Sequence, residues 1–207
     1  PREFLAASMT LDMGNTDKLA EFRAEALRMD IEVLRPCVNR SQLEFNVVDG
    51  AIDYGLAAIK GVGRPLVAHI VAERSKRPFA SITDFANRLD PKVAPRRGLE
   101  ALIAAGAFDN LVDNRGALIG GIDHILGVAH RISNGDAVGQ SDFFGAAKDD
   151  DIRLPQNAAW TPAERLQKEF DAIGFYLSSH PLAGFRHAMA TLRAHFAGVK
   201  ATALPGP

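Results

Sequence analysis

The sequence predicts a mainly α-helical protein with one small β-hairpin. Three features carry this prediction: apolar residues recur at helical spacing, cap-forming residues precede several of these stretches, and one short region alternates with a period of two. The 207 residues are enough for one or two domains with a real core. Hydrophobic residues make up 47% and charged residues 24%, which excludes a wholly disordered or collagen-like chain.

Helix signals run along most of the chain. Asn15 or Thr16 can cap the second predicted helix, and Ser81 precedes another stretch of helical periodicity. Thr161 and Glu164 have the spacing of a capping box. The sequence therefore predicts helices over residues 2–12, 15–30, 56–60, 64–74, 81–89, 95–105, about 114–132, from 161 onward and from 182 onward.

The β-hairpin is expected in the first third of the chain, after a loop over residues 35–39. Residues 43–48 and 51–54 alternate between apolar and polar side chains on either side of Asp49-Gly50. A two-residue type I′ turn needs positive φ at both central positions, and Asp-Gly is among the pairs that favour it.

The net charge of −1 hides a local asymmetry. Between Lys60 and Arg97 there are nine basic side chains against three acidic ones, a balance of +6. A basic stripe inside a neutral chain is typical of a surface that binds a polyanion. A solvated face of helices explains the same pattern equally well, so charge alone does not decide between them.

The first motif with a chemical rationale is a glycine turn between two predicted helices. An apolar stretch ending at Lys60 is followed by Gly61-Val62-Gly63 and a helix that begins near Arg64. This is the helix-hairpin-helix pattern, in which glycines let the backbone approach a phosphate and the next helix N-terminus binds it. Val62 would fill the space between the helices, and the two cations would add charge. A plain tight turn fits the glycines by themselves.

A second, degenerate copy follows about 45 residues later. The predicted helix that begins near Arg96 and Arg97 ends at Gly106, with Ala107 where the motif has its other glycine. Two such units indicate a tandem pair that straddles both backbones of a duplex, and they favour DNA-backbone binding over the plain turn. The predicted DNA-binding residues are Lys60, Gly61, Val62, Gly63, Arg64, Arg96, Arg97 and Gly106.

A second motif lies in a loop that is rich in Gly, Asp and Ala. Gln140-Ser141-Asp142-Phe143-Phe144 combines a hydrogen-bonding glutamine with two adjacent aromatic residues. Exposed paired aromatics mark binding surfaces, and the pentapeptide resembles motifs that bind the sliding clamp of DNA replication. The alternative is that both phenylalanines hold the loop on the core of this protein.

The sequence predicts no catalytic residue and no metal ligand in this chain. Cys37 has no neighbouring His, and Asp149-Asp150-Asp151 is typical of a solvated acidic run. The lone cysteine excludes a disulfide framework and fits a reducing compartment. No run approaches the ~20 apolar residues of a membrane span, and no signal-peptide pattern opens the chain.

Seven distinctive stretches follow one another along nearly the whole chain: EFLAA (3–7), NTDK (15–18), RMDIEVL (28–34), YGLAAIKGVG (54–63), LEALIAAGAFD (99–109), the pentapeptide (140–144) and GFYLSSHPL (174–182). In these stretches and their order the chain resembles the catalytic alpha subunits of bacterial DNA polymerase III, which are replicative polymerases of the C family. A stand-alone helix-hairpin-helix module of a repair nuclease or ligase is the alternative, and the pentapeptide and the last stretch disfavour it. A pure protein-interaction scaffold is a third interpretation.

The resemblance implies a domain map. Residues 1–48 would be the C-terminal part of the fingers, 49–135 the tandem helix-hairpin-helix of the clamp-binding domain, 136–158 a mobile loop with the clamp motif, and 159–207 a helical connector toward an OB domain. The chain starts at Pro1, without Met and inside a predicted helix, so we expect it to be a piece of a longer protein.

The resemblance also implies the function of the whole protein. It would be a cytoplasmic DNA-directed DNA polymerase, a nucleotidyltransferase whose palm holds catalytic aspartates and two magnesium ions upstream of Pro1. This chain alone would be inactive and without a cofactor. Its partners would be primer-template duplex, the sliding clamp and other holoenzyme subunits. The clamp motif departs from the family pattern, because Phe143 stands where Leu or Met is usual.

Overall fold

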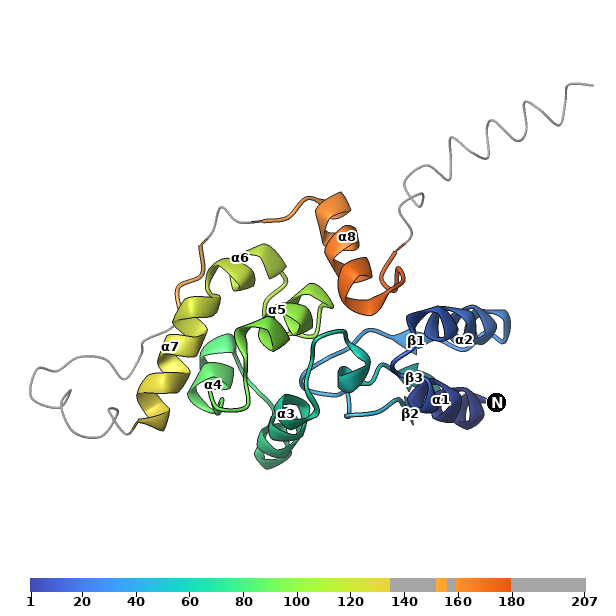
Figure 1. Ribbon diagram of the computed structural model, residues 1–207, viewed down its shortest axis with the longest axis horizontal. Coiled ribbons are helices and arrows are strands. Elements are labelled where there is room, and N and C mark those ends of the chain that lie inside the picture. Colours follow the sequence, from blue (N-terminus) through green and yellow to red (C-terminus); the bar gives the residue numbers. More distant parts are fainter. Residues whose placement is uncertain (135–151, 156–158, 180–207) are drawn as a thin grey trace, which may run out of the picture.

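The computed structural model describes residues 1–134, 152–155 and 159–179, and Figure 1 shows their arrangement. Within these ranges the chain is mainly helical with a small sheet, which confirms the predicted fold class. The α-helices are α1 Arg2–Leu11, α2 Thr16–Arg28, α3 Arg64–Lys76, α4 Ile82–Asn87, α5 Arg96–Ala104, α6 Arg115–Gly120, α7 Ile122–Ser133 and α8 Pro162–Ile173. None of the described helices is long and apolar enough to cross a membrane.

The sheet contains the predicted hairpin and one strand more. β2 (Asn46–Val48) and β3 (Ala51–Asp53) pair antiparallel, with φ of 50° at Asp49 and 82° at Gly50. β1 (Val33–Leu34), which the sequence did not predict, pairs parallel with β3, so the strand order is β1-β3-β2. A two-residue strand is too short to show an alternating pattern, and its partner lies far along the chain.

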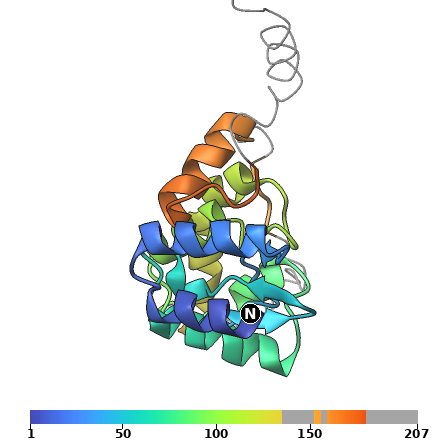
Figure 2. The same cartoon turned by 90° about the vertical axis from the view of Figure 1, so that its right-hand side faces the viewer.

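The helices α1 and α2 lie side by side at one end of the molecule (Figure 2). α1 packs against β2 and β3, and α2 contacts β1. The predicted cap of α2 is present, because the Asn15 side chain accepts a hydrogen bond from the Lys18 backbone N–H at 3.2 Å.

The prediction of a helix over residues 56–60 is wrong. This segment forms only one 3-10 turn, η1 (Leu56–Ala58). The N–H groups of Leu56 and Ala57 donate to carbonyls of the loop before the hairpin, and the Lys60 N–H donates to the Ala172 carbonyl in α8. In an α-helix the Lys60 N–H would donate to the Leu56 carbonyl. Because it donates to α8 instead, the chain does not continue as an α-helix.

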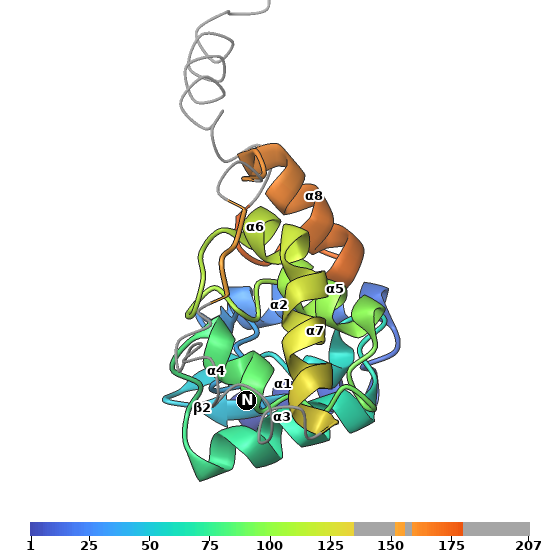
Figure 3. The same cartoon turned by 90° about the vertical axis from the view of Figure 1, so that its left-hand side faces the viewer.

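The other described helices follow the predictions closely, and the helix expected from residue 182 onward lies outside the described residues. The Ser81 side chain accepts a hydrogen bond from the Asp84 N–H and caps α4, as expected. The single helix expected over about 114–132 is interrupted at Gly121 and forms α6 and α7. Figure 3 shows α7 along the end of the molecule opposite α1 and α2.

One continuous hydrophobic core extends from Leu5 in α1 to Leu177 beyond α8. Tyr54 is fully buried in it, with its ring centroid 4.8 Å from that of Phe45 and 6.3 Å from that of Phe175. α8 packs against α5, so the segment predicted as a connector shares the core of the helices before it. This packing fixes where α8 stands relative to the glycine turns.

Candidate nucleic-acid interface

Hairpin 1, the turn at Gly61-Val62-Gly63 between η1 and α3, presents open backbone. Gly61 has φ of 82°, a left-handed conformation that glycine adopts readily, whereas Val62 is 9% exposed and packs into the core. A Cβ added to Gly61 would meet only Arg97 Nε within 4 Å, and one added to Gly63 only Pro65 Cδ. The outer side of both glycines is therefore accessible to a phosphate.

The N-terminus of α3 lies at the same turn and lacks a side-chain cap. Gly63 is its N-cap, and its first turn carries no acidic residue. The first N–H groups of a helix have no partner within it, and with the helix dipole they attract anions. α2, α4, α6 and α8 differ, because their own N-cap side chains accept hydrogen bonds from these groups.

The four cations predicted to bind DNA, Lys60, Arg64, Arg96 and Arg97, differ in their surroundings. Among the described residues, the side chains of Lys60 and Arg97 form no ion pair. Arg64 Nη1 lies 3.6 Å from Glu44 Oε1, and both side chains are about half exposed or more. Arg96 is engaged, because it donates to Glu100 Oε1 at 2.8 Å and also to Asp123.

The pKa of Arg96 reflects these contacts. The hydrogen bonds to Glu100 and Asp123 raise the pKa of its guanidinium above the ordinary value. Both carboxylates neutralise the charge of Arg96 locally, so Lys60 and Arg97 are the cations best placed to meet an external anion.

Much of the basic stripe between Lys60 and Arg97 serves the fold itself. Arg74 is 8% exposed and donates to the carbonyls of Val38 and Ser41. Arg77 makes a two-pronged ion pair with Asp84. The charge balance of the sequence therefore overstates the positive charge available to a ligand.

A groove next to hairpin 1, here called the hairpin-1 groove, brings in residues that the sequence analysis missed. Its volume is about 450 Å³, and it lies between the turn, α5 and α8. Lys168 Nζ stands 4.9 Å from the ring centroid of Trp160, and both residues line the groove. The remaining lining residues are Lys60, Gly61, Arg97, Glu100, Ala101, Ala104, Ile119, Asp171 and Ala172.

Hairpin 2, the turn at Ala105-Gly106-Ala107 after α5, has a different environment. Its glycine is the left-handed residue of a Schellman motif, with φ of 85°. The Ala107 N–H donates to the Leu102 carbonyl and the Gly106 N–H to the Ile103 carbonyl. Gly106 is buried, and the next helix, α6, is capped by Asn114. The turn thus satisfies its own backbone groups.

Arg115 fills the space beside Gly106. A Cβ at Gly106 would overlap its guanidinium. Arg115 donates to both carboxylate oxygens of Asp109 at 2.7 and 2.6 Å, and its Nη1 lies 3.5 Å from Glu169 Oε2. Burial alone would lower the pKa of Arg115, but the hydrogen bonds and charges of Asp109 and Glu169 raise it. This network ties α6, hairpin 2 and α8 together.

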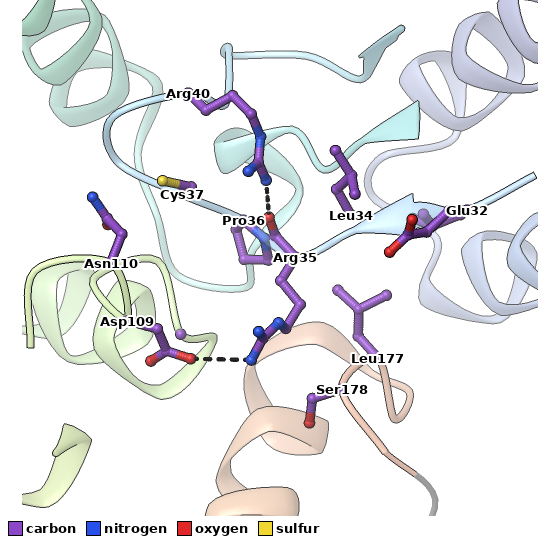
Figure 4. Close-up of a pocket in the computed structure, with 12 residues that line it drawn as sticks. Glu32, Leu34, Arg35, Pro36, Cys37, Arg40, Asp109, Asn110, Leu177 and Ser178 are labelled. Carbon is purple, nitrogen blue, oxygen red and sulfur yellow. Dashed lines mark hydrogen bonds and ion pairs between the residues drawn. The ribbon is translucent and has the colours of Figure 1, made fainter. Parts of the chain in front are cut away.

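Gly106 lines a separate pocket of about 610 Å³, shown in Figure 4. Arg35 points across this pocket, with Nη1 3.4 Å from Asp109 Oδ2. Arg40 Nη2 donates to the Arg35 carbonyl at 2.6 Å. The structure therefore brings Lys60, Gly61 and Arg97 together in the hairpin-1 groove, whereas Gly106 lines another pocket.

Comparisons with known proteins place these turns in a family. A helix-hairpin-helix motif model matches residues 30–118. The chain is 40% identical over 184 residues to DNA polymerase III subunit alpha of Caulobacter vibrioides, 37% over 195 residues to that of Borreliella burgdorferi, and 38% over 188 residues to that of Escherichia coli. The chain is a homologue of one segment of the DNA polymerase III alpha subunit. The predicted resemblance is confirmed.

The match covers 88–91% of this chain but only 16–17% of these relatives. The chain therefore spans about a sixth of the length of these relatives. This match favours the polymerase interpretation over a stand-alone repair module.

Two expectations taken from the polymerase resemblance concern other parts of the molecule. The clamp pentapeptide, Gln140–Phe144, lies outside the described residues. In the part of the chain that the structure describes, no group of three or more His, Cys, Asp or Glu side chains could hold a metal ion.

Proposed function

We propose that this chain grips duplex DNA through its backbone phosphates as one segment of a bacterial replicative DNA polymerase. The main support for this proposal is hairpin 1. There, two glycines with open space beside them and a helix N-terminus without a side-chain cap lie near Lys60 and Arg97. Backbone N–H groups and cations recognise phosphates without reading bases, so binding is independent of sequence. The homology to DNA polymerase III alpha subunits gives this grip its setting.

The whole protein would then be a cytoplasmic DNA-directed DNA polymerase. Phosphoryl transfer with two magnesium ions would take place in a palm domain outside this chain. The chain itself would hold the primer-template duplex near that centre, together with other subunits of the holoenzyme. Held this way, the duplex keeps a high effective concentration at the active site between steps.

Duplex titrations at several salt concentrations test the grip. Lys60→Ala and Arg64→Ala should each lower the salt dependence of binding by about one phosphate contact. Arg28→Ala is the matched control, because Arg28 is an exposed arginine at the end of α2 that pairs with Glu25. An unchanged salt slope in both hairpin variants would contradict the assignment.

Clamp tethering is the second part of the proposal, and it is supported by the sequence of the pentapeptide alone. Phe143 and Phe144 would enter an apolar pocket on the sliding clamp while Gln140 bonds at its rim. Burial of one Phe side chain contributes about 1.5–3 kcal/mol. Replacing both by Ala should therefore weaken clamp binding at least about tenfold in calorimetry. Duplex affinity should stay within about twofold, because distant sites act independently.

A further inference from the structure

We propose that the hairpin-1 groove holds the base of an unpaired nucleotide, so that the chain also binds single-stranded DNA adjoining the duplex. The inference rests on the proposed duplex grip and adds a second class of nucleic acid to the same surface. It starts from the residues of the groove that a duplex backbone alone would not need: Trp160, Lys168 and the small apolar side chains of the lining.

The lining of the groove combines cations with small apolar side chains. Lys60 and Arg97 stand next to the open backbone of Gly61, where a phosphate would bind. Small and apolar side chains line the same groove: Ala101, Ala104, Ile119 and Ala172. A phosphate joined to a flat, largely apolar base matches this combination of cations and apolar surface. The volume of about 450 Å³ falls within the range of about 300–1,000 Å³ usual for small-ligand pockets.

The carboxylates that also line the groove have partners of their own. Glu100 Oε1 accepts from Arg96 at 2.8 Å, and Asp171 Oδ1 accepts from Gln167 Nε2 at 2.9 Å. With Lys60, Arg97 and Lys168 present, three cations face two carboxylates, one of which is neutralised by an arginine outside the groove lining.

Trp160 supplies the aromatic surface. Its indole is partly exposed, and Lys168 Nζ lies 4.9 Å from the ring centroid. Aromatic side chains bind single strands by stacking, because every base has a π face and sequence matters little. The bases of an intact duplex are already stacked on one another, so only an unpaired base can reach the indole.

The experiment uses the intrinsic fluorescence of the 207-residue chain, because Trp160 is its only tryptophan. A blunt duplex is compared with the same duplex carrying a single-stranded oligothymidine tail. We expect the tail to quench the fluorescence and to raise the affinity about tenfold, in line with the stacking of one base. Trp160→Ala should remove that gain while leaving affinity for the blunt duplex unchanged, and Trp160→Phe should keep most of it.

Lys168→Gln provides a second variant if Trp160→Ala loses its circular dichroism spectrum. Lys168→Gln should reduce the affinity gained from the tail. Arg28→Ala should lower the affinity for both probes equally, as the loss of any exposed cation does, and leave the gain from the tail unchanged. Equal binding of both probes by the unaltered chain, without quenching, overturns the base site and leaves the duplex grip standing. Failure of the chain to bind either probe overturns both.

Discussion

Hairpin 1 and hairpin 2 look alike in sequence and differ in what occupies the space beside the glycine. At Gly61 that space is open, with only Arg97 near it. At Gly106 it is filled by the buried guanidinium of Arg115. The helix after hairpin 1 starts without a side-chain cap, whereas Asn114 caps the helix after hairpin 2.

This difference separates two uses of one backbone geometry. A positive-φ glycine removes a Cβ, and the vacated space can admit either an outside group or a side chain of the same protein. At hairpin 1 the space beside the glycine is open to a group from outside the protein. At hairpin 2 it is filled by Arg115, which joins α6 to α8. Substitutions at hairpin 2 should therefore change stability, and those at hairpin 1 should change DNA binding.

The largest expected effect comes from removing the arginine of hairpin 2. Arg115→Met keeps most of the side-chain volume but leaves Glu169, which is fully buried, and Asp109 without their main cation. Breaking a buried ion pair on one side costs about 3–5 kcal/mol. Urea unfolding followed by circular dichroism should show a loss of this size.

Arg165→Met is the control for that variant. Arg165 also contacts Asp109, with Nη2 2.9 Å from Oδ2, but its side chain is 32% exposed. A partly exposed ion pair contributes about 1 kcal/mol or less. Equal losses of unfolding free energy in the two variants would show that the buried position of Arg115 beside Gly106 does not strengthen its ion pairs.

The glycines themselves give the next smaller effect. Gly61→Ala places a Cβ in open space and incurs only the strain of positive φ, about 1–2 kcal/mol. Gly106→Ala carries the same strain and also forces Arg115 to move, so its loss of unfolding free energy should be clearly larger. Paired denaturation curves check the order. A smaller loss of unfolding free energy for Gly106→Ala than for Gly61→Ala would contradict the claim that Arg115 tightly fills the space beside Gly106.

Local features of the fold could be predicted from the sequence, and long-range ones could not. The caps at Asn15, Ser81 and Thr161 and the Asp49-Gly50 turn depend on residues within a few positions of one another. The α-helix expected over residues 56–60 does not form, and the sequence could not show this, because the Lys60 N–H donates to Ala172, which is distant in sequence.

The site shows the same division. The glycines and cations of hairpin 1 are contiguous and were predicted together. Trp160 and Lys168 were not, because only the packing of α8 on α5 brings them to the groove. The burial of Arg115 was also not predicted, because most arginines in proteins are exposed and nothing in the sequence marks this one as buried.

The smallest expected change in stability, and the sharpest test of the comparison, is to give hairpin 1 the cap that hairpin 2 already has. Gly63 has φ of −81° and ψ of 142°, the extended conformation usual for an N-cap, so Ser fits there without strain. Gly63→Ser should stabilise the protein by a few tenths of a kcal/mol, because the hydroxyl can accept from the N–H of Leu66, the third residue of α3, since Pro65 at the second position has no N–H.

The same hydroxyl would compete with a phosphate for that N–H group, so duplex affinity should fall while stability rises. Asn114→Ala is the converse variant: losing its cap should cost about 1 kcal/mol of stability and leave duplex affinity unchanged. Thermal denaturation and a duplex titration on both variants measure the four quantities. If Gly63→Ser binds duplex as well as the unaltered chain, the α3 N-terminus is not where the phosphate binds, and the cations alone must carry the grip.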